Sequence, residues 1–238
     1  MDFYFNSWRL VPANLVWAAF LALVVGVGLI WPVGALLVAP LLALPTVGLF
    51  RLAALIGRGH PVSFSDALVA WRRYGLPALE SGAILTLMTT VLLVDLSVGL
   101  ASPDPVGIAF ATAAFWGWLA SWAVGLVFWA LLVDPEREGE GPRAAARLAA
   151  LLVVAHPIRI GALLLVGALL LAASAVLLAA LLTVSVAFVA LAATRYVLPA
   201  ADRLEGRATV RQDVGDVAGE VMAAGPGRGD AVRRARRR

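Results

Sequence analysis

Residues 160–194 read IGALLLVGALLLAASAVLLAALLTVSVAFVALAAT, thirty-five residues without one charged side chain. A helix that crosses a bilayer needs about 20 apolar residues at a rise of about 1.5 Å per residue. As one helix this run would be roughly 50 Å long, too long for a single upright crossing of a hydrocarbon core of about 30 Å. It is just long enough for two short crossings. The chain is therefore expected to be an integral membrane protein.

The composition of the whole chain points the same way. Hydrophobic residues make up 62% and charged residues 14% of the 238 residues, whereas soluble domains carry about 25% charge. The absence of Cys excludes disulfides and thiolate metal ligands. All nineteen basic residues are Arg. No nucleic-acid recognition motif accompanies them, so we interpret the basic charge as membrane topology and predict no nucleic-acid partner.

The apolar runs predict an all-α, polytopic helical membrane protein with about six transmembrane helices arranged as three hairpins. Each hairpin is expected to follow a short amphipathic helix that lies in the membrane interface and ends near Pro12, Pro77 or Pro157. The transmembrane domain covers 1–199, and 200–238 is predicted to be a disordered, Arg-rich cytoplasmic tail. The six predicted spans are 13–31, 33–56, 76–96, 106–133, 158–176 and 178–198.

Three local signals refine this division. Ser63 and Asp66 form a capping box, which predicts a short helix over 66–74. A second amphipathic helix is expected over 143–155, ended by the His156-Pro157 pair. Pro40 and Pro45 interrupt the second span and predict a broken or kinked helix. Such a break is either a simple kink or part of a ligand site at membrane depth.

The distribution of Arg predicts the orientation. All nineteen lie in 1–11, 51–75, 134–159 and 195–238, and the turns near Trp31 and at 97–105 contain none. Because cytoplasmic loops carry the Arg excess, both termini are predicted to be cytoplasmic. An even number of spans follows, which favours two spans within 160–194. The alternative is one long tilted helix with the tail outside.

Few residues are candidates for a site. Glu80 and Asp95 are the only acidic side chains within predicted spans, where such groups are costly and often functional or paired. Trp118 and Trp122 share a helix face with Phe115 and Trp129, a face that packs on neighbours or stacks on a flat ligand such as a sugar. Gly117, Ser121 and Gly125 form an adjacent small-residue face for helix packing. The tail residues expected to contact anionic lipid headgroups are Arg233, Arg234, Arg236, Arg237 and Arg238.

The sequence shows no arrangement typical of catalysis. No hydroxyl, His and carboxylate set suggests a nucleophile, and two His without Cys make a poor metal site. No glycine-rich phosphate loop is present. We therefore predict a protein that is not an enzyme, with no metal and no cofactor, whose first partner is the lipid bilayer.

Four short motifs, taken in order, resemble the YesL-like family of small bacterial membrane proteins. They are Asn14-Leu-Val-Trp17, Pro45-Thr-Val-Gly48, the segment from Phe64 to Trp71, and the Ala-rich segment from Arg147 to His156-Pro157. The resemblance covers roughly 14–200, and the chain departs from the family by extra residues between Trp17 and Pro45 and by its Arg-rich tail. It carries no functional residues over. It implies an accessory role in carbohydrate uptake at a bacterial plasma membrane, with ABC-type sugar permease subunits as partners. The alternative function is a small transporter or channel that uses the Pro-broken second span and Glu80.

Overall fold

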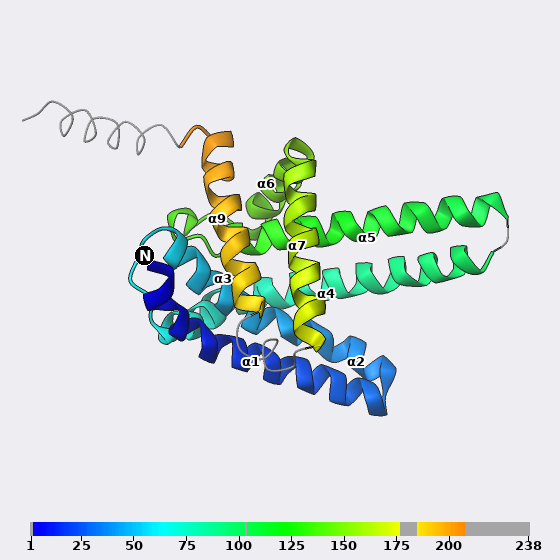
Figure 1. Ribbon diagram of the computed structural model, residues 1–238, viewed down its shortest axis with the longest axis horizontal. Coiled ribbons are helices and arrows are strands. Elements are labelled where there is room, and N and C mark those ends of the chain that lie inside the picture. The colour runs from blue at the N-terminus through cyan, green and yellow to red at the C-terminus, as the bar shows by residue number, and fades with distance from the viewer. Residues whose placement is uncertain (1, 103, 177–184, 208–238) are drawn as a thin grey trace, which may run out of the picture. The chain divides into compact units, whose positions relative to one another are not determined.

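The computed structural model describes residues 2–102, 104–176 and 185–207, except for the side chains of 2–9 and 174–176. These residues form helices joined by short turns, as the sequence predicts (Figure 1). The chain falls into two units, Met1–Leu198 and Pro199–Arg238. In chain order the elements are α1 (Asp2–Ile30), α2 (Pro32–Val38), the 3-10 helix η1 (Ala39–Leu42), α3 (Ala43–Gly57), α4 (Phe64–Ala101), α5 (Pro105–Leu132), the 3-10 helix η2 (Pro135–Arg137), α6 (Pro142–Ala155), α7 (Pro157–Val176) and α9 (Val186–Leu204).

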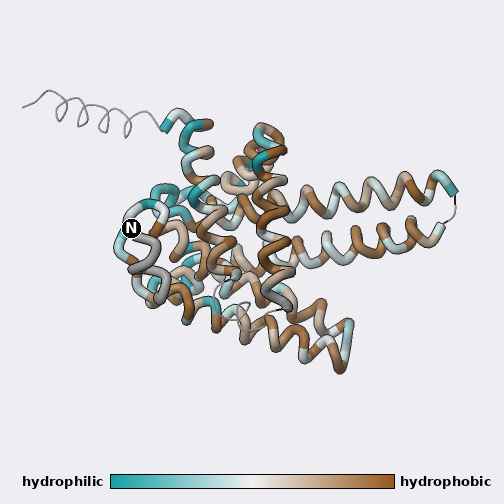
Figure 2. The backbone as a smooth tube through the Cα atoms, viewed as in Figure 1, coloured by the Kyte–Doolittle hydropathy of each residue, from teal (hydrophilic) through white to brown (hydrophobic). Residues whose placement is uncertain are grey.

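Four stretches are long and apolar enough to cross a membrane, namely Leu10–Ile30, Pro32–Gly57, Phe64–Ala101 and Pro105–Leu132. The pair α6 and α7 adds a fifth if the two helices, bent by 102° at their junction, count as one broken span. Hydrophobic residues run along these helices, and hydrophilic residues gather at their ends (Figure 2). The helical part of the prediction is therefore confirmed, with four or five helices suited to spanning a membrane.

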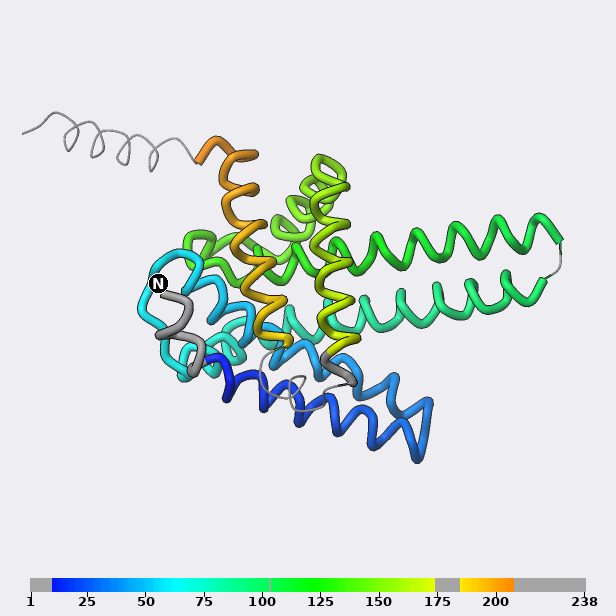
Figure 3. The backbone as a smooth tube through the Cα atoms, viewed as in Figure 1, coloured from blue at the N-terminus to red at the C-terminus, as the bar shows by residue number. Residues whose placement is uncertain are grey.

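The turns of the first two hairpins lie at the same end of the Met1–Leu198 unit. In Figure 3 the turn from α1 to α2 and the turn from α4 to α5 both lie on the right, and the α3–α4 and α5–α6 connections lie on the left. The right-hand turns contain no Arg, whereas Arg58 and Arg137 belong to the left-hand connections. The charge asymmetry that the sequence predicts is thus an asymmetry between two ends of the helices.

Two of the three interfacial helices are not separate elements. α1 runs through Pro12 and α4 runs through Pro77 without interruption, so the prediction that a helix ends at these prolines is wrong. A proline removes one backbone hydrogen bond, but most helix stability in a folded protein comes from packing. α4 packs against both α3 and α5. These contacts keep α4 continuous over 38 residues.

The second span is interrupted as predicted. Residues Ala39–Leu42 form a 3-10 turn between α2 and α3, and Pro40 lies within it. Pro40 cannot donate a backbone hydrogen bond, which favours a change of helix type at this point. Pro45 instead lies in the first turn of α3, where a missing N–H costs little. The second half of this span, α3, therefore begins at Ala43, two residues before Pro45.

The third predicted break, at His156-Pro157, is confirmed. α6 ends at Ala155, α7 begins at Pro157, and the helices are bent by 102°. A Cβ atom on Gly167 of α7 would lie 3.6 Å from Val189 of α9. One helix through 160–194 would hold these residues roughly 33 Å apart at 1.5 Å per residue, so the single long helix is excluded. Residues 177–184 lie outside the described part of the chain.

α7 and α9 run side by side in opposite directions, and across the direction of α4 and α5 (Figure 1). α9 continues through Pro199 to Leu204, so the predicted start of the disordered tail at residue 200 is too early. Gly206, with φ +72°, follows the helix end in a conformation that glycine adopts easily. The rest of the predicted tail, with Arg233, Arg234, Arg236, Arg237 and Arg238, lies outside the described residues.

Candidate functional site

The most elaborate polar structure lies at the end of the helices that carries the α3–α4 and α5–α6 connections. We call it the arginine–carboxylate cluster. Four arginines and four carboxylates contribute, so their formal charges cancel. The arginines come from α3 and its C-terminal cap, from α4 and from η2, and the carboxylates come from the α5–α6 connection. The members are Arg51, Arg58, Arg73, Asp134, Glu136, Arg137, Glu138 and Glu140.

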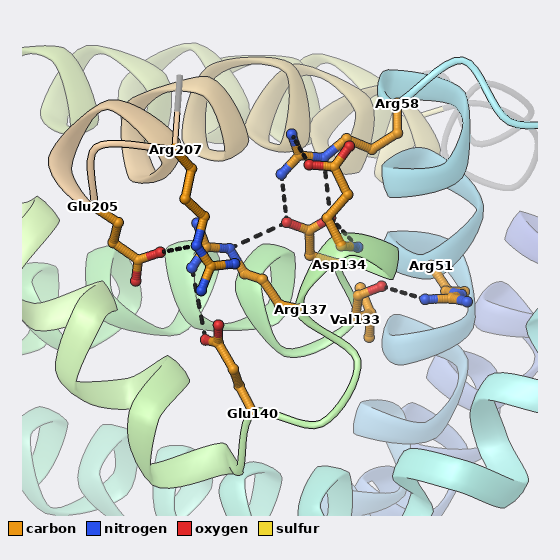
Figure 4. Close-up of polar contacts among 9 residues, drawn as sticks. Arg51, Arg58, Val133, Asp134, Arg137, Glu140, Glu205 and Arg207 are labelled. Atoms are coloured by element: carbon orange, nitrogen blue, oxygen red, sulfur yellow. Dashed lines mark hydrogen bonds and ion pairs between the residues drawn. The ribbon is translucent and has the colours of Figure 1, made fainter. Parts of the chain in front are cut away.

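Asp134 is the centre of the cluster and is fully buried. Its carboxylate accepts two hydrogen bonds from Arg58, from Nε at 3.1 Å and from a terminal nitrogen at 2.6 Å. Arg137 Nε lies 3.2 Å from the same carboxylate on the other side (Figure 4). The side chains of Arg58 and Arg137 are only 8% and 2% exposed. A buried charge is stable only when it is paired, and this carboxylate is hydrogen-bonded to Arg58 and forms an ion pair with Arg137.

Glu138 joins two further arginines that are distant in sequence. It forms ion pairs with Arg51 of α3 and with Arg73 of α4, the latter at 2.6 Å. Burial raises the pKa of Glu138, but the hydrogen bonds and charges of Arg51 and Arg73 outweigh this and hold the pKa below its ordinary value. Arg51 also donates to the carbonyl of Val133 at 2.9 Å, which satisfies an acceptor at the C-terminal end of α5.

The cluster is built to hold elements together. It ties α3 and α4 to the connection that follows α5, and it leaves each carboxylate occupied by at least one arginine. Carboxylates held in this way are poor general bases. Within the ranges that the structure describes, no three His, Cys, Asp or Glu side chains come together in a way that could hold a metal ion.

A second set of contacts surrounds the break in the second span. The indole N–H of Trp17 in α1 donates to the hydroxyl of Thr46 in α3 at 3.0 Å, and this hydroxyl donates to the carbonyl of Leu42 at 2.7 Å. The polar groups next to the 3-10 turn are therefore satisfied from inside the protein. Trp17 and Thr46 belong to two different motifs of the YesL-like resemblance.

The motif from Phe64 to Trp71 contacts the same part of α3. Trp71 of α4 packs so closely on Gly48 of α3 that a Cβ atom there would lie 2.6 Å from the indole nitrogen. The Trp71 ring also meets the ring of Phe20 in α1 edge-on, with centroids 6.3 Å apart. Motif residues at positions 17, 46, 48 and 71 thus form one continuous contact among α1, α3 and α4.

Asn14, the first residue of the first motif, links α1 to α9. Its side chain is fully buried, and its carbonyl oxygen accepts from the backbone N–H of Ala187 at 3.1 Å. Ala187 lies in the first turn of α9, where backbone N–H groups have no partner within the helix. Asn14 therefore supplies an acceptor that α9 does not provide for itself.

The structure does not bring Glu80 and Asp95 into a site. Both side chains are exposed on α4, and among the described residues neither forms an ion pair or a hydrogen bond. Helix α4 places them fifteen residues apart, or roughly 22 Å at 1.5 Å per residue. The prediction that they bind a ligand or form a pair is not supported by any contact.

The patterned helix α5 packs against α4. Cβ atoms on Gly117 and Gly125 would lie 3.3 Å from Leu92 and 3.4 Å from Leu85, so this small-residue face lets α4 approach closely. The hydroxyl of Ser121 bonds back to the Gly117 carbonyl at 2.8 Å.

The predicted aromatic face of α5 is divided between the surface and the interior. Trp122 is 43% exposed, whereas Trp129 is 6% exposed. Trp118 is intermediate, and its ring lies 6.5 Å from that of Phe115.

Sequence reasoning missed the arginine–carboxylate cluster because the charges of 134–159 were used only to predict the orientation of the chain. A usable signal was present: acidic residues occupy alternate positions 134, 136, 138 and 140 within a part of the chain rich in Arg. Compared with known proteins, the chain matches no family model, no curated protein and no solved structure. The YesL-like resemblance therefore stays a prediction.

Proposed function

We propose that this chain is a non-enzymatic, multi-pass protein of a bacterial plasma membrane that acts as an accessory subunit for another membrane protein. The observation that supports it best is the placement of polar groups. The cluster of four arginines and four carboxylates neutralises itself at one end of the helices, and the hydroxyl of Thr46 satisfies the broken second span. Polar side chains here stabilise a rigid body and do not line a reaction site.

The proposed partner is a carbohydrate importer, with ABC-type sugar permease subunits. This part of the proposal is supported only by the resemblance of the four motifs to the YesL-like family. The contact among Trp17, Thr46, Gly48 and Trp71 adds that three of these motifs form one packing unit. A shared packing unit is a reason for such residues to occur together, whatever the partner is.

The proposed topology puts both termini and the arginine–carboxylate cluster on the cytoplasmic side. Four spans (α1, α2 with α3, α4, and α5) give this result, and six spans give it too if α7 and α9 also cross. A single Cys at Ala173, near the end of α7, distinguishes the two counts. External labelling of this Cys in intact cells supports six spans, and labelling only after lysis supports four.

Pull-down of the tagged full-length protein from its native bacterium tests the accessory function. We expect permease subunits to co-purify in detergent. They should also co-purify with the matched control variant Trp17→Phe, because this substitution changes only an internal contact. Recovery of the protein without any permease subunit would contradict the proposed partner.

A small transporter or channel is the second candidate, because the structure has the Pro-broken second span that such proteins use. It predicts saturable sugar uptake by liposomes that contain the purified protein alone, and loss of this uptake in Glu80→Gln. The internal hydrogen bonds of Thr46 favour the accessory function, because they already satisfy polar groups at the break without a ligand.

A further inference from the structure

Three arginines near the α6–α7 junction differ from those of the cluster. Arg143 and Arg147 of α6 and Arg159 of α7 are exposed, and within the described ranges none of them makes a hydrogen bond or ion pair. No acidic residue occurs in the sequence between Glu140 and Asp202. The junction therefore carries positive charge that nothing on its own helices neutralises.

Strongly exposed apolar side chains lie beside these arginines. Leu151 is 49% exposed, Val154 is 79% exposed and Ile158 is 85% exposed. Residues 143, 147, 151 and 154 are spaced by four, four and three, so they form one stripe along α6. The opposite face of α6 is buried, with Ala145, Leu148, Ala149 and Leu152.

We propose that this surface, which we call the α6–α7 corner (Arg143, Arg147, Leu151, Val154, Ile158 and Arg159), docks onto anionic phospholipid. The guanidinium groups bind headgroup phosphates, and the apolar side chains enter the adjacent acyl region. This inference rests on the proposed location of the chain in a membrane, but not on its link to an importer.

Charge and hydrophobicity together select this occupant. Arginine forms two parallel hydrogen bonds with a phosphate, and basic residues near an anionic membrane surface each contribute to binding. A free phosphate would use the arginines but leave Val154 and Ile158 exposed to water. A bilayer surface accommodates both groups at once, as it does for amphipathic interfacial helices.

Native mass spectrometry of the purified full-length protein tests the proposal. The protein, in a neutral detergent, is titrated with phosphatidylglycerol or with phosphatidylcholine, and bound lipids are counted. We expect preferential binding of phosphatidylglycerol, and about a hundredfold weaker binding in the triple variant Arg143→Gln, Arg147→Gln, Arg159→Gln. The charge-conserving triple variant with Lys at these positions should retain most of the preference.

The matched control removes three exposed charges that belong neither to the corner nor to the cluster, as Arg72→Gln, Arg195→Gln, Arg203→Gln. It should keep the phosphatidylglycerol preference, because the preference belongs to the α6–α7 corner and not to net charge. Equal binding of phosphatidylglycerol by the corner variant and the unchanged protein would overturn the proposal. So would loss of the preference in the control variant alone. Neither result depends on whether permease subunits co-purify.

Discussion

Replacing Asp134 by Asn should destabilise the protein more than any other single change in the arginine–carboxylate cluster. Asp134 is fully buried and is shared by Arg58 and Arg137, whose side chains are 8% and 2% exposed. Asparagine has nearly the same shape, so the change removes the negative charge with little effect on packing. The two guanidinium groups would then lose their buried counter-charge and keep only the partly exposed Glu136 and Glu140 as ion-pair partners.

The expected loss follows from this burial. Removing one partner of a buried ion pair costs about 3–5 kcal/mol, because the remaining charge stays out of water. In a chain of this size, a loss of 1 kcal/mol lowers the melting temperature by about 2–4 °C. Asp134→Asn should therefore lower it by roughly 6–20 °C.

Thermal unfolding in detergent, followed by the fluorescence of the eight Trp residues, measures this effect. Glu136→Gln is the matched control, because Glu136 lies 3.0 Å from the same Arg58 but its side chain is 45% exposed. Exposed ion pairs contribute about 0–1 kcal/mol, so this variant should unfold within a few degrees of the unchanged protein. Equal shifts for the two variants would refute the view that burial gives Asp134 its importance.

Two further predictions concern packing and pH. Gly48→Ala should cost about 1–3 kcal/mol, because its Cβ atom would lie 2.6 Å from the Trp71 indole nitrogen; Gly26→Ala, with no atom within 4 Å, should be neutral or stabilising, and similar melting temperatures for the two would contradict this. Glu138, whose pKa is lowered by its arginines, should stabilise the protein fully above the ordinary glutamate pKa and lose this effect as the pH falls below it. Melting temperatures of Glu138→Gln and the unchanged protein should thus differ at neutral pH and converge in acid; a constant difference would argue against the ion pairs.

The parts of the fold that local sequence determines were predictable. The apolar runs located α1, α4 and α5, and the position of Pro40 located the break in the second span. The capping box was also correct, since the backbone N–H of Ser63 donates to the Asp66 carboxylate at 2.7 Å. Each of these features depends on residues that are contiguous in the sequence.

Features that depend on distant contacts were not predictable. Pro77 resembles a helix boundary by itself, and only the packing of α4 against α3 and α5 keeps the helix continuous. The ion pair of Arg58 and Asp134 joins residues 76 positions apart, and nothing in either neighbourhood specifies the partner. Charge counts showed which end of the helices carries Arg, but not which carboxylate each Arg meets.

Labelling of single cysteines tests the transmembrane arrangement most directly, because the chain contains no Cys of its own. The two positions are Ala101, at the end of α4, and His60, in the α3–α4 connection; both are exposed. A maleimide that cannot cross membranes should label Ala101→Cys in intact cells and His60→Cys only after lysis. Labelling of both from outside, or of His60→Cys alone, would contradict the arrangement in which the arginine-bearing end faces the cytoplasm.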